Sequence, residues 1–344
     1  MNPPHPPSAP PAIGPRRILV LDDDNLIVRA VSRTLRSRGL VVVSTTDPAE
    51  ALEWARSAPP DAVVSDLHMP RSCGAQFLAA IASVAPDAMR VLMSADPDFR
   101  PKLGTLAEAR VHSLVSKSEL GTLAEHLSAL LRGRTQTAST SDEREALAHQ
   151  VAHGLARPAT QEDDAHRRRT SCWASLVAAM MDLPAEEVEQ ARLGAILHDV
   201  GQITIPPHAF ARPGSLTTAE RALLDEHPSA GTRIVDAMPA LRCALPVVGS
   251  HHERQDGSGY PQGLAGDAIP GAARAFQFVD AYDALRRGRP HAPARSHRAA
   301  IAELTTHAGR QHDSRAVLAL ATLGEEALDA ALDQGARLSN NRAP

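Results

Sequence analysis

The sequence predicts two domains of different class: an α/β doubly wound, five-stranded parallel sheet, followed by an all-α helical bundle. Three observations support this prediction. The chain has 344 residues, more than one typical domain holds. Residues 16–132 alternate short apolar runs with helical patterns, as a parallel sheet covered by helices requires. Beyond about residue 150 the pattern is helical almost throughout, with Pro and Gly at the breaks.

The first domain is expected to contain five strands, each followed by a helix. The strands are predicted at residues 18–21, 40–43, 62–65, 90–94 and 113–115. The helices are predicted at residues 26–35, from Asp47-Pro48 onward, at 76–83, around 103–109 and at 120–131. Ligands of such a sheet bind at the carboxyl ends of its strands.

Composition divides the rest of the chain. Residues 1–15 are Pro-rich and lack the apolar stretch of a signal peptide, so they are expected to be a disordered leader. Residues 133–150 begin with Thr, Ser and Gly and read as a linker that can be helical. The helical output domain is placed at residues 151–335, and a flexible tail at 336–344.

Bulk properties exclude several classes of protein. The formal net charge of −4 gives no electrostatic reason to expect a nucleic-acid or membrane partner. No apolar run approaches the roughly 20 residues that cross a bilayer. The three cysteines are far apart and are expected to be reduced, which suits a cytoplasmic protein: Cys73, Cys172 and Cys243.

Acidic residues gather where two strands of the predicted sheet end. Asp22 and Asp23 follow the first strand and Asp66 ends the third. These strands are neighbours in a doubly wound sheet, so the carboxylates converge and repel one another unless a cation such as Mg²⁺ lies between them. Ser94 and Lys117 end the fourth and fifth strands, where they could hold the oxygens of a phosphoryl group on Asp66.

Residues 16–132 therefore resemble the receiver domain of bacterial response regulators. The order of the acids, the Asp66-x-x-Met69-Pro70 stretch, Gly74, Ser94 and Lys117 matches that family. The resemblance implies that Asp66 accepts a phosphoryl group from a sensor histidine kinase and that Asp22 and Asp23 hold Mg²⁺. Ser118 stands where the family has proline, and Leu114 stands at its aromatic switch position.

The second domain is rich in histidines and carboxylates at regular intervals. Imidazole with carboxylate suits Fe, Mn, Zn, Co or Ni better than Mg²⁺ or Ca²⁺. A carboxylate such as Asp199 can bridge two metals about 3.5–4 Å apart, and a water held between them becomes a hydroxide that attacks phosphorus. The candidate ligands are Glu162, His166, His198, Asp199, His227, His251, His252 and Asp280.

These residues lie in motifs that resemble the HD-GYP subfamily of HD-domain phosphohydrolases. The motifs read ILHDVGQITIP, EHP, SHHERQDGSGYP and FVDAYDAL, in that order. The resemblance implies hydrolysis of cyclic di-GMP by two or three divalent metals, with iron or manganese most typical. It implies that His198 and Asp199 are catalytic. It also implies that all eight candidate residues are metal ligands. Arg169 matches the arginine of the family's H-x-x-R helix.

The resemblance also implies a set of substrate-binding residues. At two of these positions the chain departs from the family. Gly259, Tyr260 and Pro261 form the GYP signature and Arg289 matches a substrate-binding arginine. Gln202 occupies the position of a lysine that faces a substrate phosphate, and Ala292 replaces a basic residue. An amide donates a hydrogen bond but brings no charge to the transition state. The second HD dipeptide, His312-Asp313, lies outside the motif order and is assigned no role.

The function predicted is that of a two-component response regulator whose phosphorylated receiver controls a metal-dependent cyclic di-GMP phosphodiesterase. The expected product is the linear dinucleotide, and whether hydrolysis continues to GMP stays open. Two alternatives stay open because of Gln202 and Ala292: a weakly active or inactive module that signals by binding a ligand or a protein, and a hydrolase of another cyclic dinucleotide. The resemblance leaves room for a homodimer and for diguanylate-cyclase-type protein partners.

Overall fold

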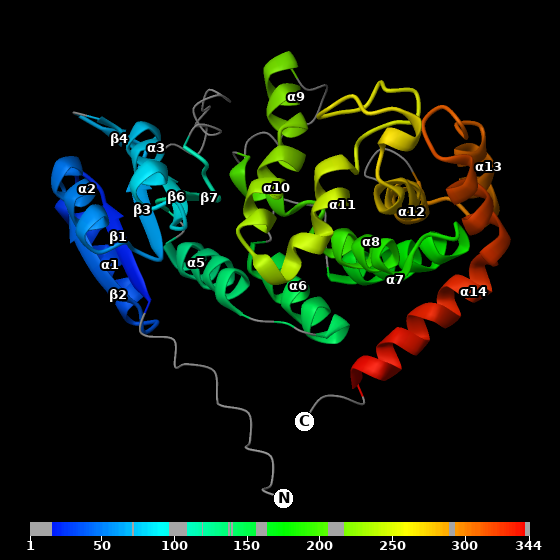
Figure 1. The fold of residues 1–344 in the computed structure, drawn as a ribbon, viewed down its shortest axis with the longest axis horizontal. Helices are drawn as coiled ribbons and strands as arrows, with labels where there is room; N and C mark the ends of the chain where they lie inside the picture. The colour runs from blue at the N-terminus through cyan, green and yellow to red at the C-terminus, as the bar shows by residue number, and fades with distance from the viewer. Residues whose placement is uncertain are drawn as a thin grey trace, which may run out of the picture.

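The computed structural model describes residues 16–70, 72–95, 109–118, 120–136, 138, 140–155, 164–205, 217–288 and 293–340. The first domain contains one parallel sheet in the order β2-β1-β3-β6-β7, drawn in blue and cyan in Figure 1. Its strands are β1 Arg17–Leu21, β2 Val41–Thr45, β3 Ala62–Asp66, β6 Met89–Ser94 and β7 Ser113–Ser116. The predicted α/β class is confirmed, with each strand within two residues of its expected bounds.

Helices cover this sheet, and capping residues begin two of them. Asp24 and Asp47 accept backbone hydrogen bonds at the starts of α1 and α2. The helices are α1 Asn25–Arg36, α2 Pro48–Ser57, α3 Gly74–Val84 and α5 Leu120–Thr135. A short hairpin of β4 His68–Met69 and β5 Ser72–Cys73 precedes α3 and was not predicted. The helix expected around 103–109 lies almost wholly outside the described residues.

The second domain is helical, as predicted. Its elements are α6 Ser141–Leu155, α7 Asp164–Met180, α8 Ala185–Leu197, η1 Val200–Thr204, α9 Thr218–Asp225, α10 His227–Asp236, η3 Pro239–Ala244, α11 Leu245–Ser250, η4 Gly266–Ala268, α12 Gly271–Arg287, α13 His297–Thr305 and α14 Ser314–Asn340. Within α14 the helix is interrupted at Gly324, where φ is 68°. None of the described helices is long and apolar enough to cross a membrane.

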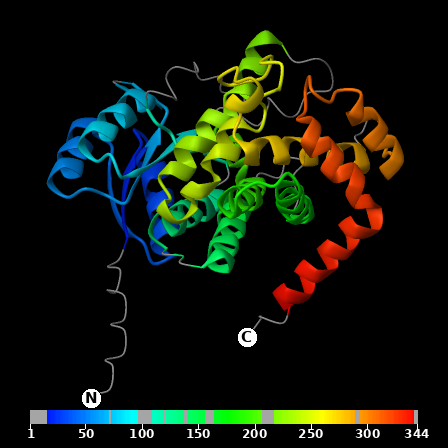
Figure 2. The same cartoon turned by 45° about the vertical axis from the view of Figure 1, so that its right-hand side comes forward.

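One hydrophobic cluster spans the two domains, and each domain also has a cluster of its own. Figure 1 shows α5 beside the sheet and α6 next to it beneath the remaining helices, and Figure 2 shows the same molecule turned by 45°. Helix α5 packs on α6 and η3, and strand β7 packs on η1. Buried residues of both domains belong to the same cluster, among them Val115 of β7, Leu127 of α5, Val151 of α6, Ile203 of η1 and Leu241 of η3. The domain boundaries proposed from composition stay a prediction, but the receiver does not stand apart from the helical domain.

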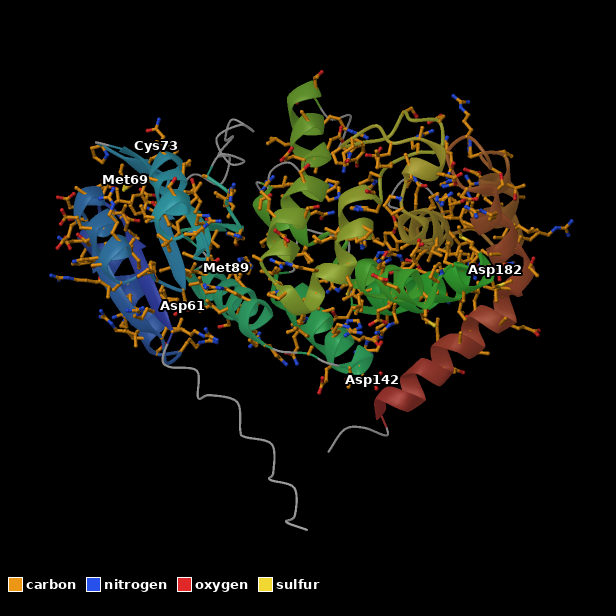
Figure 3. The ribbon with its side chains drawn as sticks, in the orientation of Figure 1. Asp61, Met69, Cys73, Met89, Asp142 and Asp182 are labelled. Carbon is orange, nitrogen blue, oxygen red and sulfur yellow. The ribbon has the colours of Figure 1, made fainter. Side chains whose placement is uncertain are left out.

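The sheet's carboxyl-terminal edge can be found from labelled side chains. In Figure 3, Asp61, which precedes β3, lies at the lower end of the sheet, whereas Met69 and Cys73 lie beyond its other end. The first turn of α3 comes very close to the end of β3 there, because a Cβ on Gly74 would overlap the Asp66 carbonyl oxygen. Glycine at this position therefore allows the loop to close beside Asp66.

We predict that Gly74→Ala destabilises the receiver, because the added methyl group meets backbone atoms that cannot rotate away. The expected loss is about 1–3 kcal/mol in the free energy of unfolding, measured by urea denaturation. Gly121→Ala is the matched control, since a Cβ at Gly121 meets nothing within 4 Å. The control should keep or raise stability, and equal losses in the two variants would contradict the packing argument.

Candidate functional site

The predicted receiver residues meet at the carboxyl edge of the sheet. Asp22 is fully buried and Asp66 nearly so, and Lys117 Nζ lies 2.8 Å from Asp22 Oδ2 and 2.9 Å from Asp66 Oδ1. Carboxylate oxygens of Asp22, Asp23 and Asp66 lie within 4.8 Å of one another, as a shared Mg²⁺ would require. Ser94 is buried at the end of β6, and its carbonyl accepts from the backbone NH of Lys117 at 2.8 Å.

Charge balance in this pocket depends on Lys117. Burial raises the pKa of the Asp22 carboxyl above its ordinary value, although Lys117 acts in the opposite direction. Burial lowers the pKa of Lys117, but its bonds to Asp22 and Asp66 outweigh this, so the pKa lies above the usual value. Lys117 is therefore a permanent cation that ties the end of β7 to Asp66, the predicted phosphoacceptor.

In the helical domain, four predicted ligands form what we call the Asp199 cluster: Asp199, His227, His251 and His252. Their ligand atoms all lie within 4.8 Å of one another. Asp199 follows the end of α8, His227 begins α10, and the two adjacent histidines follow α11. Three helix ends thus point their side chains at one place.

Backbone carbonyls determine which nitrogen these histidines present. His227 Nδ1 lies 2.7 Å from Leu224 O, and His251 Nδ1 lies 3.1 Å from Val248 O. His198 Nδ1 likewise lies 3.0 Å from Ala195 O. A carbonyl oxygen can only accept, so each Nδ1 carries a proton and Nε2 is the nitrogen left to bind a metal. An unprotonated Nε2 is the form that binds a metal.

The lone pairs presented in this way face one another. His227 Nε2 is 3.0 Å from His251 Nε2 and 3.0 Å from Asp199 Oδ1. Asp199 Oδ1 is buried and accepts no hydrogen bond from any described residue. Such an arrangement is repulsive without a cation, because buried acceptors lose their hydration and gain nothing in return. The donor set therefore fits a divalent metal.

Protonation states agree with this fit. Burial lowers the pKa of His251 below its ordinary value and lowers that of His252 much further, so both rings are neutral at pH 7. Burial acts to raise the pKa of Asp199, but His198 and His227 outweigh it and hold the carboxyl well below its usual range. Asp199 is thus an anion beside the neutral rings of His251 and His252.

A second group, the His198 cluster, adjoins the first and contains His166, His198 and Asp280. Asp199 joins the two groups. Its Oδ1 faces His227 and His251, whereas its Oδ2 lies 3.6 Å from His198 Nε2. A carboxylate with one oxygen toward each cluster has the arrangement of a bridging ligand.

Asp283 is a residue that the sequence analysis missed. It is 1% exposed on α12, one turn after Asp280, and its Oδ2 lies 2.7 Å from His166 Nδ1. Arg169 Nε and Arg287 Nε each approach its carboxylate to 2.7 Å. Burial acts to raise the pKa of Asp283, but His166 and Arg169 lower it to about 2. This ionised carboxylate can hold His166 with Nε2 turned toward Asp280, 3.6 Å away.

The clusters open into a cavity of about 490 Å³, a size typical of small-ligand sites. Tyr260 and Gly259 of the GYP signature line it, and the Tyr260 ring stacks on His252 with centroids 4.7 Å apart. Burial raises the pKa of the Tyr260 hydroxyl, which stays neutral. Gln202 also lines the cavity, and its amide Nε2 donates to Asp199 Oδ2.

The loop that carries Tyr260 is held by a second residue missed from the sequence. Glu253 is completely buried, and its two carboxylate oxygens accept from the backbone NH groups of Gln262 at 2.7 Å and Leu264 at 2.9 Å. A Cβ on Gly259 would overlap the backbone of residues 252–254, so glycine is required there. Asp283 and Glu253 both lie inside the motifs. In the sequence they look like ordinary solvent-exposed acids, and only their burial in the structure shows otherwise.

The structure brings together seven of the eight predicted metal ligands. Glu162 and Arg289 lie outside the described residues. Pro261 is exposed beside the cavity and does not line it. His312, which was assigned no role, belongs to neither metal cluster but is buried and lines the same cavity. The catalytic, metal and substrate roles of these residues stay predictions.

Comparisons with known proteins give the family. A family model described as "HD domain" matches residues 135–316, and one described as "Response regulator receiver domain" matches residues 18–128. The chain is 31% identical over 326 residues to the "Cyclic di-GMP phosphodiesterase response regulator RpfG" of Xanthomonas campestris pv. campestris, an alignment that covers 88% of this chain and 86% of the relative.

Two further relatives are named as phosphodiesterases of different cyclic dinucleotides. A "Cyclic di-GMP phosphodiesterase" of Thermotoga maritima is 23% identical over 338 residues, covering 91% of each chain. The "3'3'-cGAMP-specific phosphodiesterase 2" of Vibrio cholerae is 30% identical over 160 residues, covering 46% of this chain and 31% of its own.

We predict that Asp283→Asn weakens metal binding at the His198 cluster by about 10- to 100-fold, because His166 loses the carboxylate that orients it. Titration with Mn²⁺, followed by calorimetry, measures this affinity. Asp236→Asn, at an exposed position, is the control and should bind Mn²⁺ as the wild type does. Wild-type affinity in Asp283→Asn would show that His166 needs no such support.

Proposed function

Because the chain belongs to the response regulators that carry an HD domain, we propose that it hydrolyses cyclic di-GMP at the Asp199 and His198 clusters under control of phosphorylation at Asp66. One observation carries the catalytic part of the proposal. A half-buried, anionic Asp199 turns one oxygen toward each of two adjoining ligand groups, and members of both groups line a ligand-sized cavity. Two relatives that match this chain over most of its length are named as cyclic di-GMP phosphodiesterases.

The chain's own residues would divide the work as follows. His227, His251, His252 and Asp199 would hold one metal, and His166, His198 and Asp280, with Asp199 shared, would hold another. Divalent metals, when bound, supply Lewis acidity to the phosphodiester and activate the attacking water. Iron or manganese fits this mixed donor set, and Glu162 would serve any third ion.

The substrate side would use the cavity. Tyr260 offers a neutral hydroxyl and a ring face beside the ligands, and the Gly259–Pro261 loop frames the opening. Arg289 is proposed to neutralise part of the dinucleotide's charge. Gln202 would act on Asp199 as well as on substrate, because its amide already donates to that carboxylate.

One observation favours an alternative. Gln202 supplies no positive charge to the phosphodiester, so the transition state receives less electrostatic stabilisation than a lysine would give. A slow enzyme, or a module that binds ligand and signals through proteins such as diguanylate cyclases, would follow from this. The relative named for 3'3'-cGAMP keeps another cyclic dinucleotide open as the substrate.

We expect full-length protein loaded anaerobically with Fe²⁺ or Mn²⁺ to convert cyclic di-GMP to linear product, detected by chromatography. Asp199→Asn should lower the rate by at least about 100-fold, because it removes the charge shared by both clusters. Asp267→Asn, on the surface, should leave the rate unchanged. Absence of product with either metal, while cyclic di-GMP still binds, would favour the signalling module.

Phosphorylation control would use the contact between the domains. Lys117 bonds Asp66 and ends β7, and β7 packs on η1, the turn that directly follows Asp199. A phosphoryl group on Asp66 would draw Lys117 to new oxygens and shift β7 against η1. Mg²⁺ at Asp22 and Asp23 and a sensor kinase would supply the reaction. Because α5 already packs on α6, a homodimer formed through α5 would use another face of that helix.

Acetyl phosphate should add one phosphoryl mass to the wild type and none to Asp66→Asn. In Val115→Ala, phosphorylation should persist while the change in hydrolysis rate that it causes shrinks by about 2- to 30-fold, because the β7 side of the contact is lost. Val43→Ala, on the exposed edge strand, is the matched control and should respond as the wild type does. Full response in Val115→Ala would contradict transmission through β7 and η1.

A further inference from the structure

The cavity beside the metal ligands has a second polar region, formed by segments far apart in the sequence. We call it the 254/312 wall, and it consists of Arg254, Gln277, Gln311 and His312. None of the four belongs to either metal-ligand cluster. The wall therefore faces the part of a ligand that the metals do not hold.

His312 is the most unusual member of the wall. Its side chain is 6% exposed, and its Nδ1 is buried without a hydrogen-bond partner in the described part of the chain. The ring packs edge-on against Phe278, with centroids 5.4 Å apart. Burial, together with His307 and Arg254, lowers the pKa of His312 to about 4, so the ring is neutral and offers one donor and one acceptor. Buried polar nitrogens without a partner are rare and point to a missing ligand.

Arg254 is similarly unsatisfied. Its Nε is buried and makes no hydrogen bond to any residue that the structure describes, and the carboxylate of Asp256 is 3.8 Å away, beyond hydrogen-bond distance. Its side chain is 34% exposed at the cavity. A guanidinium is planar and permanently charged, and it presents paired donors that match two adjacent acceptors.

Backbone pairing holds the two segments of the wall together. Gln255 N donates to Gln311 O at 3.3 Å and Asp256 N donates to Arg310 O at 2.9 Å. On the other side, the Gln277 amide donates to the Glu253 carbonyl. The wall is thus assembled before a ligand arrives, which lowers the entropy cost of binding.

We propose that Arg254 and His312 form a subsite that recognises a guanine base, which rests on the proposed function and names the part of the substrate that the chain reads. Guanine presents O6 and N7 as adjacent acceptors, which suit the paired donors of arginine. Its N1–H can donate to an imidazole nitrogen of His312. Adenine carries an amino donor at N6 in place of the O6 acceptor, so it opposes the paired donors of Arg254.

Binding to the full-length protein in EDTA tests this subsite separately from catalysis. Calorimetric titration should show tighter binding of cyclic di-GMP than of cyclic di-AMP, with 3'3'-cGAMP, which has one guanine, as the intermediate probe. Arg254→Met should weaken binding of cyclic di-GMP by about 10- to 100-fold and change binding of cyclic di-AMP far less. His312→Phe, which keeps the packing on Phe278, should act in the same direction by about 10-fold.

Arg310→Met is the control, because Arg310 is exposed and does not line the cavity. It should bind all three dinucleotides as the wild type does. Equal weakening of the guanine and adenine ligands in Arg254→Met would mean that Arg254 holds phosphate, and would overturn the subsite. Wild-type protein without a guanine preference, or without binding, would overturn it too. Guanine-selective binding without hydrolysis in Mn²⁺ or Fe²⁺ would instead count against the proposed enzyme alone.

Discussion

The carboxylate of Asp199, whose Oδ1 is buried, is the group on which the rest of the site depends. Its two oxygens face different histidines, and its Oδ1 has no hydrogen-bond donor among the described residues. Carbonyl oxygens accept from Nδ1 of His198, His227 and His251, which leaves Nε2 of each ring turned toward Asp199. A site built in this way is stable with cations in place and repulsive without them.

Several elements of the fold position the Asp199 carboxylate. Helix α8 ends just before it, and η1 returns at once toward α10, where a Cβ on Gly201 would overlap the His227 backbone. That close approach lets residues from two turns share one cluster. The same η1 packs on β7 of the receiver, so the Asp66 pocket and the Asp199 cluster are connected through packed elements.

Much of this could be predicted from the sequence. Buried parallel strands read as continuous apolar runs, so all five were found, whereas the two-residue strands β4 and β5 are too short to show a period. The histidine motifs identified seven ligands that the structure does bring together. Asp283 escaped because an acid one turn from Asp280 looks like a solvated residue until its burial is known.

What could not be predicted depends on distance across the fold. His312 carries no motif, and its place in the cavity follows from the pairing of residues 310–311 with the loop at 255–256. The packing of α5 on α6 and of β7 on η1 requires the surfaces of the two domains to be complementary in shape. Neither shape follows from periodicity, which describes only which face of an element is apolar.

The central claim is that Asp199 joins two metal sites. The most direct measurement is anomalous X-ray diffraction from crystals of the protein loaded with Mn²⁺ under anaerobic conditions. The account predicts at least two anomalous peaks, one on each side of Asp199, with His227 and His251 beside one and His166 and His198 beside the other. A single peak, or metal bound away from Asp199, would contradict it.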